Sequence, residues 1–236
     1  MGENGFPQNA SCIQRKTGLC KRFHSKGSNR HADLSRAASG PWFECCVVRG
    51  VGPLGELRDL PEGFIYQPRF LAPSEQRQLL DEIEPLAFHD VRMHGVVARR
   101  RVIQYGWKYA FDGARLSEGP PLPPFLLPVR SRAAQLAEVP ADALSEALLT
   151  EYQPGAPIGW HRDAPGFGIV VGISLLSACR FRFRRGPDRG SDRVTLTLDP
   201  GSAYVLAGPS RTEWQHSIPE VDTLRYSITF RTLRKR

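Results

Sequence analysis

Apolar positions recur with a regular period only from about residue 57 onward; the first 56 residues show neither helical nor strand periodicity. The segment 1–56 is rich in glycine, serine, asparagine and basic residues, a composition that offers little apolar surface to bury. We interpret it as a basic, mostly disordered extension, although a misassigned translation start would give the same pattern. The ordered domain is therefore expected to span residues 57–236.

The first part of this domain predicts strands mixed with helices. Residues 64–66 form a short apolar run that favours a strand. A helix is expected to begin near Ser74 and to end before Pro85, because large aliphatic residues recur on one face between them. Residues 101–109 favour a strand that is interrupted by a turn or bulge at Gly106.

Prolines are concentrated in the middle of the chain. The segment 119–124 contains four prolines, so it cannot be a helix or a central strand, and we expect an extended connector. Apolar positions at helical spacing then predict a helix near 129–138 and a second, short helix near 141–148.

From Leu148 onward the pattern changes to short apolar runs that are divided by clusters of glycine, proline and aspartate. Such spacing is typical of an all-β sandwich or barrel. The chain is therefore predicted to be an α+β domain whose C-terminal half is a double-sheet β roll. The expected strands cover residues 148–153, 168–176, 179–185, 193–198, 203–206 and 224–232.

Composition bounds the class of protein. Hydrophobic residues make up 41% and charged residues 24% of the 236-residue chain, which are globular values. No stretch reaches the roughly 18 consecutive apolar residues that a membrane helix needs, and the first residues lack the apolar core of a secretory signal. We expect a soluble, monomeric, cytoplasmic protein that has no membrane partner.

The net charge of +8 is unevenly placed, because residues 1–46 contribute +4 and the remaining 190 residues the other +4. A basic excess of this kind attracts polyanions, and it also serves solubility. Four of the five cysteines lie in the same first segment, which argues against a disulfide framework. The spacing of a possible zinc set there, Cys12, Cys20, His24 and His31, fits no recognised zinc finger.

Candidate chemistry lies in the run Trp160-His161-Arg162-Asp163 and in His216, which follows 53 residues after Asp163. His161 and Asp163 are two positions apart on an extended segment, so their side chains point the same way. Two imidazoles and one carboxylate are the ligand set of a non-haem Fe(II) facial triad, which leaves positions open for an oxo acid and O2. An HxD pair alone occurs often by chance.

The last predicted strand strengthens this interpretation. Arg225, Ser227, Thr229 and Arg231 share one face by period two, and apolar residues occupy the other face. Arginine suits carboxylates because its planar fork binds both oxygens. The pattern therefore favours an anion pocket for a dicarboxylate, although a solvated edge strand would carry similar residues.

The motifs Tyr152-x-Pro154-Gly155, His161-x-Asp163, His216 and Arg225-x-Ser227-x-Thr229-x-Arg231 together resemble the AlkB family of Fe(II)/2-oxoglutarate dioxygenases over roughly residues 60–233. The resemblance implies a jelly-roll (double-stranded β-helix) core with supporting N-terminal helices, and Fe(II), 2-oxoglutarate and O2 as cofactors. It implies that His161, Asp163 and His216 are catalytic metal ligands. It further implies that Arg225 pairs with the distal carboxylate of 2-oxoglutarate and that Tyr152, Ser227 and Arg231 line the cosubstrate site.

Two positions depart from the pattern of the family's nucleic-acid-repairing members, which usually carry asparagine where this chain has Thr150 and Ser227. Both residues can still form hydrogen bonds, so we expect 2-oxoglutarate binding to be retained. The departures leave the substrate open.

The leading hypothesis is oxidative demethylation of N-alkylated DNA or RNA bases, with release of formaldehyde, succinate and CO2. Tyr105, Trp107 and Tyr109 could form an aromatic row on which an unpaired base stacks, or they could pack the core of a β-ribbon. Arginines at 99–101, 180, 182, 184, 185 and 189 suit either a phosphate track or a solvated outer face. The alternatives are hydroxylation or demethylation of a protein side chain or tRNA nucleoside, and a non-catalytic nucleic-acid-binding module.

Overall fold

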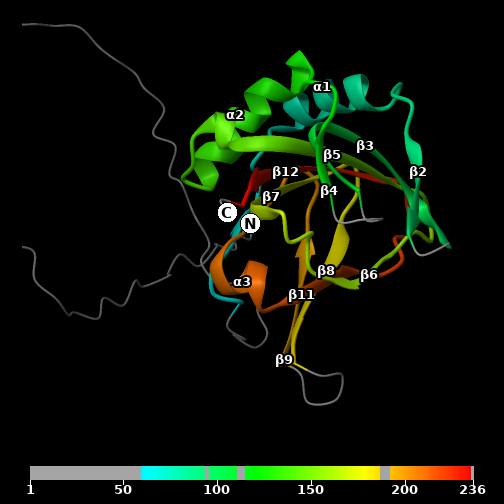
Figure 1. Ribbon diagram of the computed structural model, residues 1–236. Helices are drawn as coiled ribbons and strands as arrows, with labels where there is room; N and C mark the ends of the chain where they lie inside the picture. The colour runs from blue at the N-terminus through cyan, green and yellow to red at the C-terminus, as the bar shows by residue number, and fades with distance from the viewer. Residues whose placement is uncertain (1–59, 94–95, 111–114, 187–191, 235–236) are drawn as a thin grey trace, which may run out of the picture. The chain divides into compact units, whose positions relative to one another are not determined.

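Two antiparallel β-sheets lie face to face in the computed structural model, which describes residues 60–93, 96–110, 115–186 and 192–234 (Figure 1). The predicted extension 1–56 and Arg189 lie outside these residues. The larger sheet has the strand order β1-β10-β7-β12-β5-β3-β2, with β4 paired to β3. Its strands are β1 (Phe64–Gln67), β2 (His89–Met93), β3 (Val96–Ala110), β4 (Arg115–Glu118), β5 (Leu144–Tyr152), β7 (Phe167–Leu175), β10 (Ala203–Leu206) and β12 (Arg225–Leu233).

The smaller sheet has the order β6-β11-β8-β9 and faces the larger one from below in Figure 1. Its strands are β6 (Ile158–His161), β8 (Cys179–Arg185), β9 (Asp192–Leu198) and β11 (Gln215–Ile218). On β8 the apolar and basic residues alternate as predicted, because Phe181 and Phe183 are buried between the sheets and Arg180 is exposed on the outer face. These two facing sheets confirm the predicted double-sheet roll.

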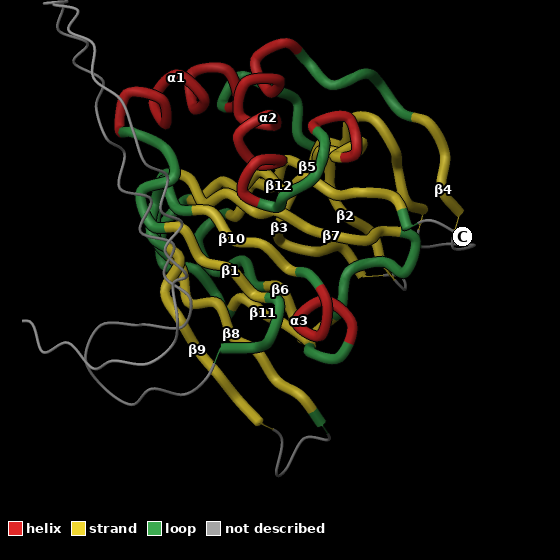
Figure 2. The backbone as a smooth tube through the Cα atoms, turned by 90° about the vertical axis from the view of Figure 1, so that its left-hand side faces the viewer, coloured by secondary structure: helices red, strands yellow, loops and turns green. Residues whose placement is uncertain are grey.

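The helices α1 (Pro73–Ile83) and α2 (Leu127–Leu136) cover the outer face of the larger sheet, whereas α3 (Gly208–Thr212) lies beside the smaller one (Figure 2). Glu75 of α1 accepts a 2.7 Å hydrogen bond from the backbone N–H of Ala72, which satisfies one donor at the helix start. Two 3-10 turns, Pro124–Leu126 and Ala141–Ala143, precede α2 and β5. Within the described part of the chain, no helix is long and apolar enough to cross a membrane.

The apolar core has two layers because β12 is buried on both faces. Tyr226, Ile228 and Phe230 pack outward against the helices, together with Ile83 of α1 and Ala133 of α2. The alternate residues of β12 point inward between the two sheets, as the period-two pattern predicted. The inward face of this central strand therefore forms the floor of the space between the sheets.

The structure corrects one predicted element, the short helix near 141–148. Only a 3-10 turn is present at Ala141–Ala143, and β5 begins at Leu144. This strand lies between β3 and β12 and is buried on both faces, because Ala147 and Leu149 are buried on one face and Glu146 and Thr150 on the other. A strand covered on both sides carries a nearly continuous apolar run, which periodicity cannot separate from a buried helix.

Candidate metal and cosubstrate site

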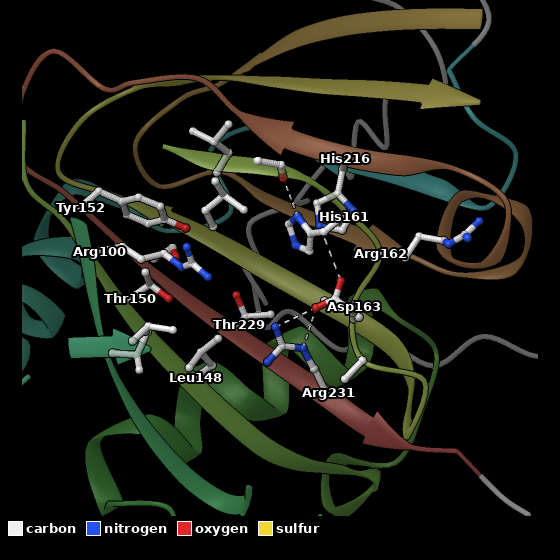
Figure 3. Close-up of a pocket in the computed structure, with 18 of the residues that line it drawn as sticks. Arg100, Leu148, Thr150, Tyr152, His161, Arg162, Asp163, His216, Thr229 and Arg231 are labelled. Atoms are coloured by element: carbon white, nitrogen blue, oxygen red, sulfur yellow. Dashed lines mark hydrogen bonds and ion pairs between the residues drawn. The ribbon is translucent and has the colours of Figure 1, made fainter. Parts of the chain in front are cut away.

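A cavity of about 490 Å³ lies between the two sheets and contains all of the residues of the proposed triad (Figure 3). Side chains from β3, β5 and β12 line it on one side, and side chains from β6, β8 and β11 line it on the other. Strand alternation explains this composition, because every second residue of a two-sided strand faces the space between the sheets.

His161, Asp163 and His216 converge at one end of the cavity. Antiparallel pairing of β6 with β11 places His161 directly opposite His216, and their ring centroids are 4.3 Å apart. Asp163 follows two residues after His161, and its Oδ2 lies 3.6 Å from Nε2 of His216. One donor atom from each residue lies within 4.8 Å of the other two. The set can therefore hold one metal ion, as predicted.

The electrostatics of the three residues suit a metal. Burial raises the pKa of Asp163, but the guanidinium of Arg231 and the imidazole of His216 outweigh burial and hold that pKa well below its usual range. Burial lowers the pKa of His161, and burial together with the neighbouring His161 lowers the pKa of His216 to about 3. An ionised carboxylate and two neutral imidazoles are the protonation states that ligate a divalent cation.

Hydrogen bonds orient two of these groups and leave one atom of each free. The Nδ1 of His161 lies 2.9 Å from the backbone oxygen of Gly159, so a proton on Nδ1 leaves Nε2 as the acceptor. Arg231 donates from Nε and Nη2 to Oδ1 of Asp163, at 3.0 and 2.8 Å. The buried Oδ2 of Asp163 accepts no hydrogen bond from the residues that the structure describes. A buried carboxylate oxygen without a donor fits a metal ligand.

Arg231 is itself held by a second carboxylate, Glu146 of β5. Its Nη1 lies 2.9 Å from both carboxylate oxygens of Glu146, whose side chain is fully buried. Burial is the largest influence on Glu146 and raises its pKa, and Arg231 opposes that shift. Glu146, Arg231 and Asp163 therefore form a continuous ion-paired row beneath the cavity.

Arg225 lies six residues earlier on the same face of β12, and its environment is different. Its Nη2 donates to Oγ of Ser174 at 3.2 Å, and its guanidinium lies 4.7 Å from the ring centroid of Tyr152, which is its register partner on β5. The Nε and Nη1 atoms are buried and have no partner in the ranges that the structure covers. A buried guanidinium with unsatisfied donors fits an incoming carboxylate.

The two residues that depart from the repair-enzyme pattern are neighbours in the structure. Thr150 and Ser227 are direct register partners on β5 and β12, both are buried, and both line the cavity. Their hydroxyls replace two amides on the floor between Arg225 and Arg231. The departures therefore act on one pair of neighbouring positions.

Arg211 was not predicted from the sequence, and it fixes the turn that follows Asp163. Its guanidinium donates to four backbone oxygens of this turn, with distances of 2.8 to 3.2 Å, and the side chain is largely buried. Arg211 belongs to α3, which comes shortly before β11 and His216. One side chain thus ties together the segments that carry two members of the triad.

The aromatic row expected at Tyr105, Trp107 and Tyr109 is divided at Gly106, where β3 stops pairing with β5 and begins to pair with β4. Gly106 adopts φ +73°, a left-handed conformation that disrupts the regular alternation of β3. Tyr105 consequently packs against the helix-side core, whereas Tyr109 lines the cavity near Phe167, with ring centroids 6.2 Å apart. Trp107 is absent from the cavity lining. Of the three residues, Tyr109 alone is placed to meet a substrate there.

Two arginines that the motifs did not single out also line the cavity. Arg100 of β3 is the register partner of Tyr152 and lies beside it in Figure 3, and burial lowers its pKa. Arg162 points away from the triad, on the side of the view opposite Arg100. Arg100 has only the signal of period two on a strand, and Arg162 follows the last residue of β6. Neither signal shows what the side chain faces.

The outer face of the smaller sheet is basic and aromatic. Trp160 points away from the cavity-facing His161, and the guanidiniums of Arg182 and Arg184 lie 5.1 and 4.8 Å from its ring centroid. Arg180 on β8 and Arg193 on β9 are exposed on the same sheet. Positive charge beside an aromatic ring is suited to a polyanion that also offers flat groups for stacking.

Comparisons with known proteins agree with this geometry. A family model described as the 2OG-Fe(II) oxygenase superfamily matches residues 63–231. The chain is 29% identical over 175 residues to the Bos taurus protein named "Alpha-ketoglutarate-dependent dioxygenase alkB homolog 7, mitochondrial", covering 72% of this chain and 73% of the relative. It is 35% identical over 144 residues to the Mus musculus "DNA oxidative demethylase ALKBH2", covering 54% of this chain and 58% of the relative.

A solved structure titled "The structure of OsALKBH1" superposes with a TM-score of 0.59 at 17% sequence identity, covering 76% of this chain and all of the other. Identity at this level supports the fold, which agrees with the predicted jelly-roll core. The matched family segment includes the proposed triad and both β12 arginines.

Proposed function

The chain belongs to the AlkB-like 2OG-Fe(II) oxygenases and is a dioxygenase, and from this premise we propose that it oxidatively demethylates N-alkylated nucleic-acid bases. One observation carries the proposal: the cavity beside the triad is lined by an aromatic ring, Tyr109, and by two arginines, Arg100 and Arg162. A flipped or unpaired base needs a ring to stack on, and its flanking phosphates need cations.

In this proposal Nε2 of His161, Oδ2 of Asp163 and Nε2 of His216 hold the iron. Bound Fe(II), with 2-oxoglutarate and O2, supplies the oxidation that hydroxylates a nearby C–H bond. If that carbon is an N-methyl group, the hydroxylated product breaks down to formaldehyde and the dealkylated base. The protein contributes neutral imidazoles, an ionised carboxylate and a cavity between the two sheets that holds the reactants beside the metal.

The cosubstrate role falls to the inward face of β12. Arg225 binds the distal carboxylate of 2-oxoglutarate through its unsatisfied Nε and Nη1 atoms, and Tyr152 packs beneath that guanidinium. Ser227 and Thr150 offer hydroxyls along the floor. Arg231 contributes chiefly through Asp163, because its hydrogen bonds already go to Asp163 and Glu146.

The nucleic acid has a second surface to bind. The basic outer face around Trp160, Arg182 and Arg184 supports contact with phosphates that continue beyond the cavity. The net charge of +8 acts in the same direction. Binding through such contacts weakens steeply as salt rises, which separates it from a small-molecule substrate.

The proposal is tested with a panel of N-methylated DNA and RNA oligonucleotides, incubated with Fe(II), ascorbate and 2-oxoglutarate. We expect formaldehyde release and loss of one methyl mass from a subset of the panel. The Asp163→Ala and His161→Ala variants serve as folded controls that lose turnover. Consumption of 2-oxoglutarate with no change in any oligonucleotide would reject nucleic acid as the substrate while leaving the dioxygenase intact.

The neighbouring pair Thr150 and Ser227 favours a second candidate, hydroxylation or demethylation of a tRNA nucleoside or a protein side chain. Both residues line the cavity at positions where the repair-enzyme pattern has amides. Mass spectrometry of tRNA and of the proteome from a deletion strain separates the two candidates. If the modifications of tRNA and of the proteome are the same in the deletion strain as in the wild type, and methylated bases accumulate in DNA, the second candidate is rejected.

We also propose that the protein is a cytoplasmic monomer. Size-exclusion chromatography with light scattering measures the mass, which is 26.3 kDa for one chain. Cell fractionation measures the location, and recovery in an organelle would contradict the cytoplasmic assignment.

A further inference from the structure

The strand β6 separates the cavity from the outer face of the smaller sheet. It is an edge strand, because the order of the described strands is β6-β11-β8-β9. His161 faces the cavity, while Trp160 borders the cavity and also contacts two arginines of the outer face. Gly159 is exposed at the same border, and a Cβ at this position would have no described atom within 4 Å. A ligand chain that leaves the cavity here therefore reaches the outer face by passing one strand.

The outer face carries a cluster of arginines. Arg180, Arg182 and Arg184 alternate with buried phenylalanines along β8, and Arg193 of β9 is the register partner of Arg184. Burial lowers the pKa of Arg182, and the like charges of Arg180 and Arg193 lower it further. Neighbouring guanidiniums repel one another, and a bound anion relieves this repulsion.

Arg185, at the end of the same strand, has carboxylate partners of its own. Its guanidinium forms ion pairs with Asp192 at 3.1 Å and with Glu213 at 3.4 Å. Arg182 forms no ion pair with a carboxylate in the ranges that the structure covers, and its Nη groups have no hydrogen-bond partner there. One arginine of β8 is therefore already neutralised, whereas another can still bind an anion.

Contacts within the sheet hold the Arg182 guanidinium in place before any ligand binds. Its Nε donates to Oγ of Ser217 on β11 at 3.0 Å, and its Cζ lies 5.1 Å from the ring centroid of Trp160. Arg184 is held in the same way, by Oε1 of Gln215 at 2.7 Å and by the same ring at 4.8 Å. Because these side chains are already ordered, they lose less conformational freedom when an anion binds.

The distance from the cavity to these arginines suits a flexible polyanion. Neighbouring strands lie about 4.8 Å apart, so β8 is about 10 Å from β6. Nucleotides of a stacked strand advance by about 3.4 Å each, so about three of them cover this distance. An unpaired strand can bend round the edge of β6. A duplex is too stiff to do so, because its persistence length is about 150 base pairs.

We propose that the outer face of the smaller sheet, formed by Arg180, Arg182 and Arg184 around Trp160, binds the phosphates of an unpaired strand that leaves the cavity round the edge of β6. The inference rests on the proposed function and narrows its substrate class to single-stranded DNA or RNA. The target base occupies the cavity, and about three nucleotides on one side of it lead to the arginines.

The test uses oligonucleotides that carry one N1-methylated adenine and differ in length on either side of it. Binding is measured to the full chain loaded with Mn(II) and 2-oxoglutarate. Arg182→Gln is the variant, and Arg185→Gln is the matched control, because it removes the same charge from the same strand but from an arginine that is already paired.

For single strands that extend about three or more nucleotides beyond the methylated base, we expect Arg182→Gln to bind about fivefold more weakly. The slope of log K against log salt should fall by about 0.7, which corresponds to one lost phosphate contact. Arg185→Gln should change the affinity by less than about twofold. Neither variant should change the binding of the methylated mononucleotide, which does not reach the outer face.

Turnover with Fe(II) separates this surface from the metal site, because Arg182→Gln should raise KM for the long strand and leave kcat unchanged. Equal weakening by Arg182→Gln and Arg185→Gln, or tighter binding of the matching duplex than of the single strand, would overturn the proposal. Displacement of the long strand by poly-glutamate at equal charge would overturn it in favour of an acidic protein partner. Weakened strand binding in Arg182→Gln alone, with no demethylation of any oligonucleotide, would support the surface and reject the proposed function.

Discussion

Two arginines on one strand differ in almost every contact they make. Arg225 and Arg231 both project inward from β12, six residues apart, and both are largely enclosed. Arg231 is paired with Glu146 and Asp163 through four charged hydrogen bonds of 2.8 to 3.0 Å. Arg225 has one serine hydroxyl and one aromatic ring, and no carboxylate within the described ranges pairs with it.

Arg231 therefore has its carboxylate partners within the protein, whereas Arg225 has none among the described residues. A buried guanidinium without an anion is unfavourable, because it loses hydration and gains no counter-charge. Arg231 avoids this penalty without any ligand, because its two carboxylate partners belong to the protein. Arg225 avoids it only when an anion binds, as expected for a residue that binds a cosubstrate carboxylate. On the proposed function, the same residue type orients the metal ligand Asp163 at one end of the strand and binds the cosubstrate at the other.

The largest effect is expected for Arg231→Met, which leaves Glu146 and Asp163 as buried carboxylates without a cation. Breaking a buried pair in this way costs about 3–5 kcal/mol. Denaturant unfolding of the protein without cosubstrate measures the loss. An unfolding free energy within about 1 kcal/mol of the wild type would contradict the assignment of Arg231 to the ion-paired row.

Arg225→Met is the matched variant for the other arginine, and its effect falls on binding. Truncating one partner of a buried charged pair costs about 2–5 kcal/mol, so we expect 2-oxoglutarate to bind about 30-fold or more weakly. Without cosubstrate the unfolding free energy should stay within about 1 kcal/mol of the wild type, because no partner charge is left behind. Arg225→Lys should recover binding only in part, since an ammonium cannot bind both carboxylate oxygens as a fork. Unchanged calorimetric affinity in Arg225→Met would show that another residue holds the distal carboxylate.

Glu146→Gln is expected to have an intermediate effect, because the amide keeps a hydrogen bond to Arg231 but loses the charge. We expect a loss of about 1–3 kcal/mol in unfolding free energy, and roughly 10-fold weaker Mn(II) binding as Asp163 becomes less firmly oriented. Glu151→Gln is the control, since this second buried carboxylate of β5 pairs with Arg101 at 2.7 Å, away from the cavity. Equal loss of Mn(II) affinity in both variants would rule out a specific role for Glu146.

The smallest effect is expected for Thr150→Asn, which restores the amide of the repair-enzyme pattern. Hydroxyl and amide both form hydrogen bonds, so 2-oxoglutarate affinity should change by less than about threefold, or roughly 0.6 kcal/mol. The informative measurement is the rate on the methylated oligonucleotide panel. A change in substrate preference without a change in cosubstrate affinity would assign this position to the substrate.

Sequence patterns predicted that the side chains of His161, Asp163 and His216 converge. His161 and Asp163 are two residues apart on an extended segment, and the face shared by Arg225 and Arg231 follows from period two alone. The meeting of His161 with His216 needed the resemblance to a known family, because strand pairing across 55 residues leaves no local signal.

Other features depend on strand register and could not be predicted. Glu146 reads as an ordinary polar position, and only the pairing of β5 with β12 places it opposite Arg231. Tyr204 likewise needs its register partner Gly172 to become a cavity residue. Tyr105 and Tyr109 face different surfaces because Gly106 between them adopts a left-handed conformation, which reverses an alternation that the sequence suggests is continuous. Register and bulges are set by tertiary packing, which a single sequence does not encode locally.

The hydrogen bonds of Arg211 affect which metal ion the protein binds. Its four bonds to backbone oxygens fix the turn after Asp163, while Arg231 and the oxygen of Gly159 orient the carboxylate and one imidazole. Protein contacts rather than a bound cation hold these metal-ligand atoms in place. Their arrangement therefore does not select Fe(II) over another divalent first-row metal ion of similar size. Intrinsic affinity then rises from Fe(II) through Co(II) and Ni(II) to Cu(II). We therefore expect loading with iron to depend on the supply of metals around the protein, and we expect traces of nickel or copper to inhibit the purified enzyme.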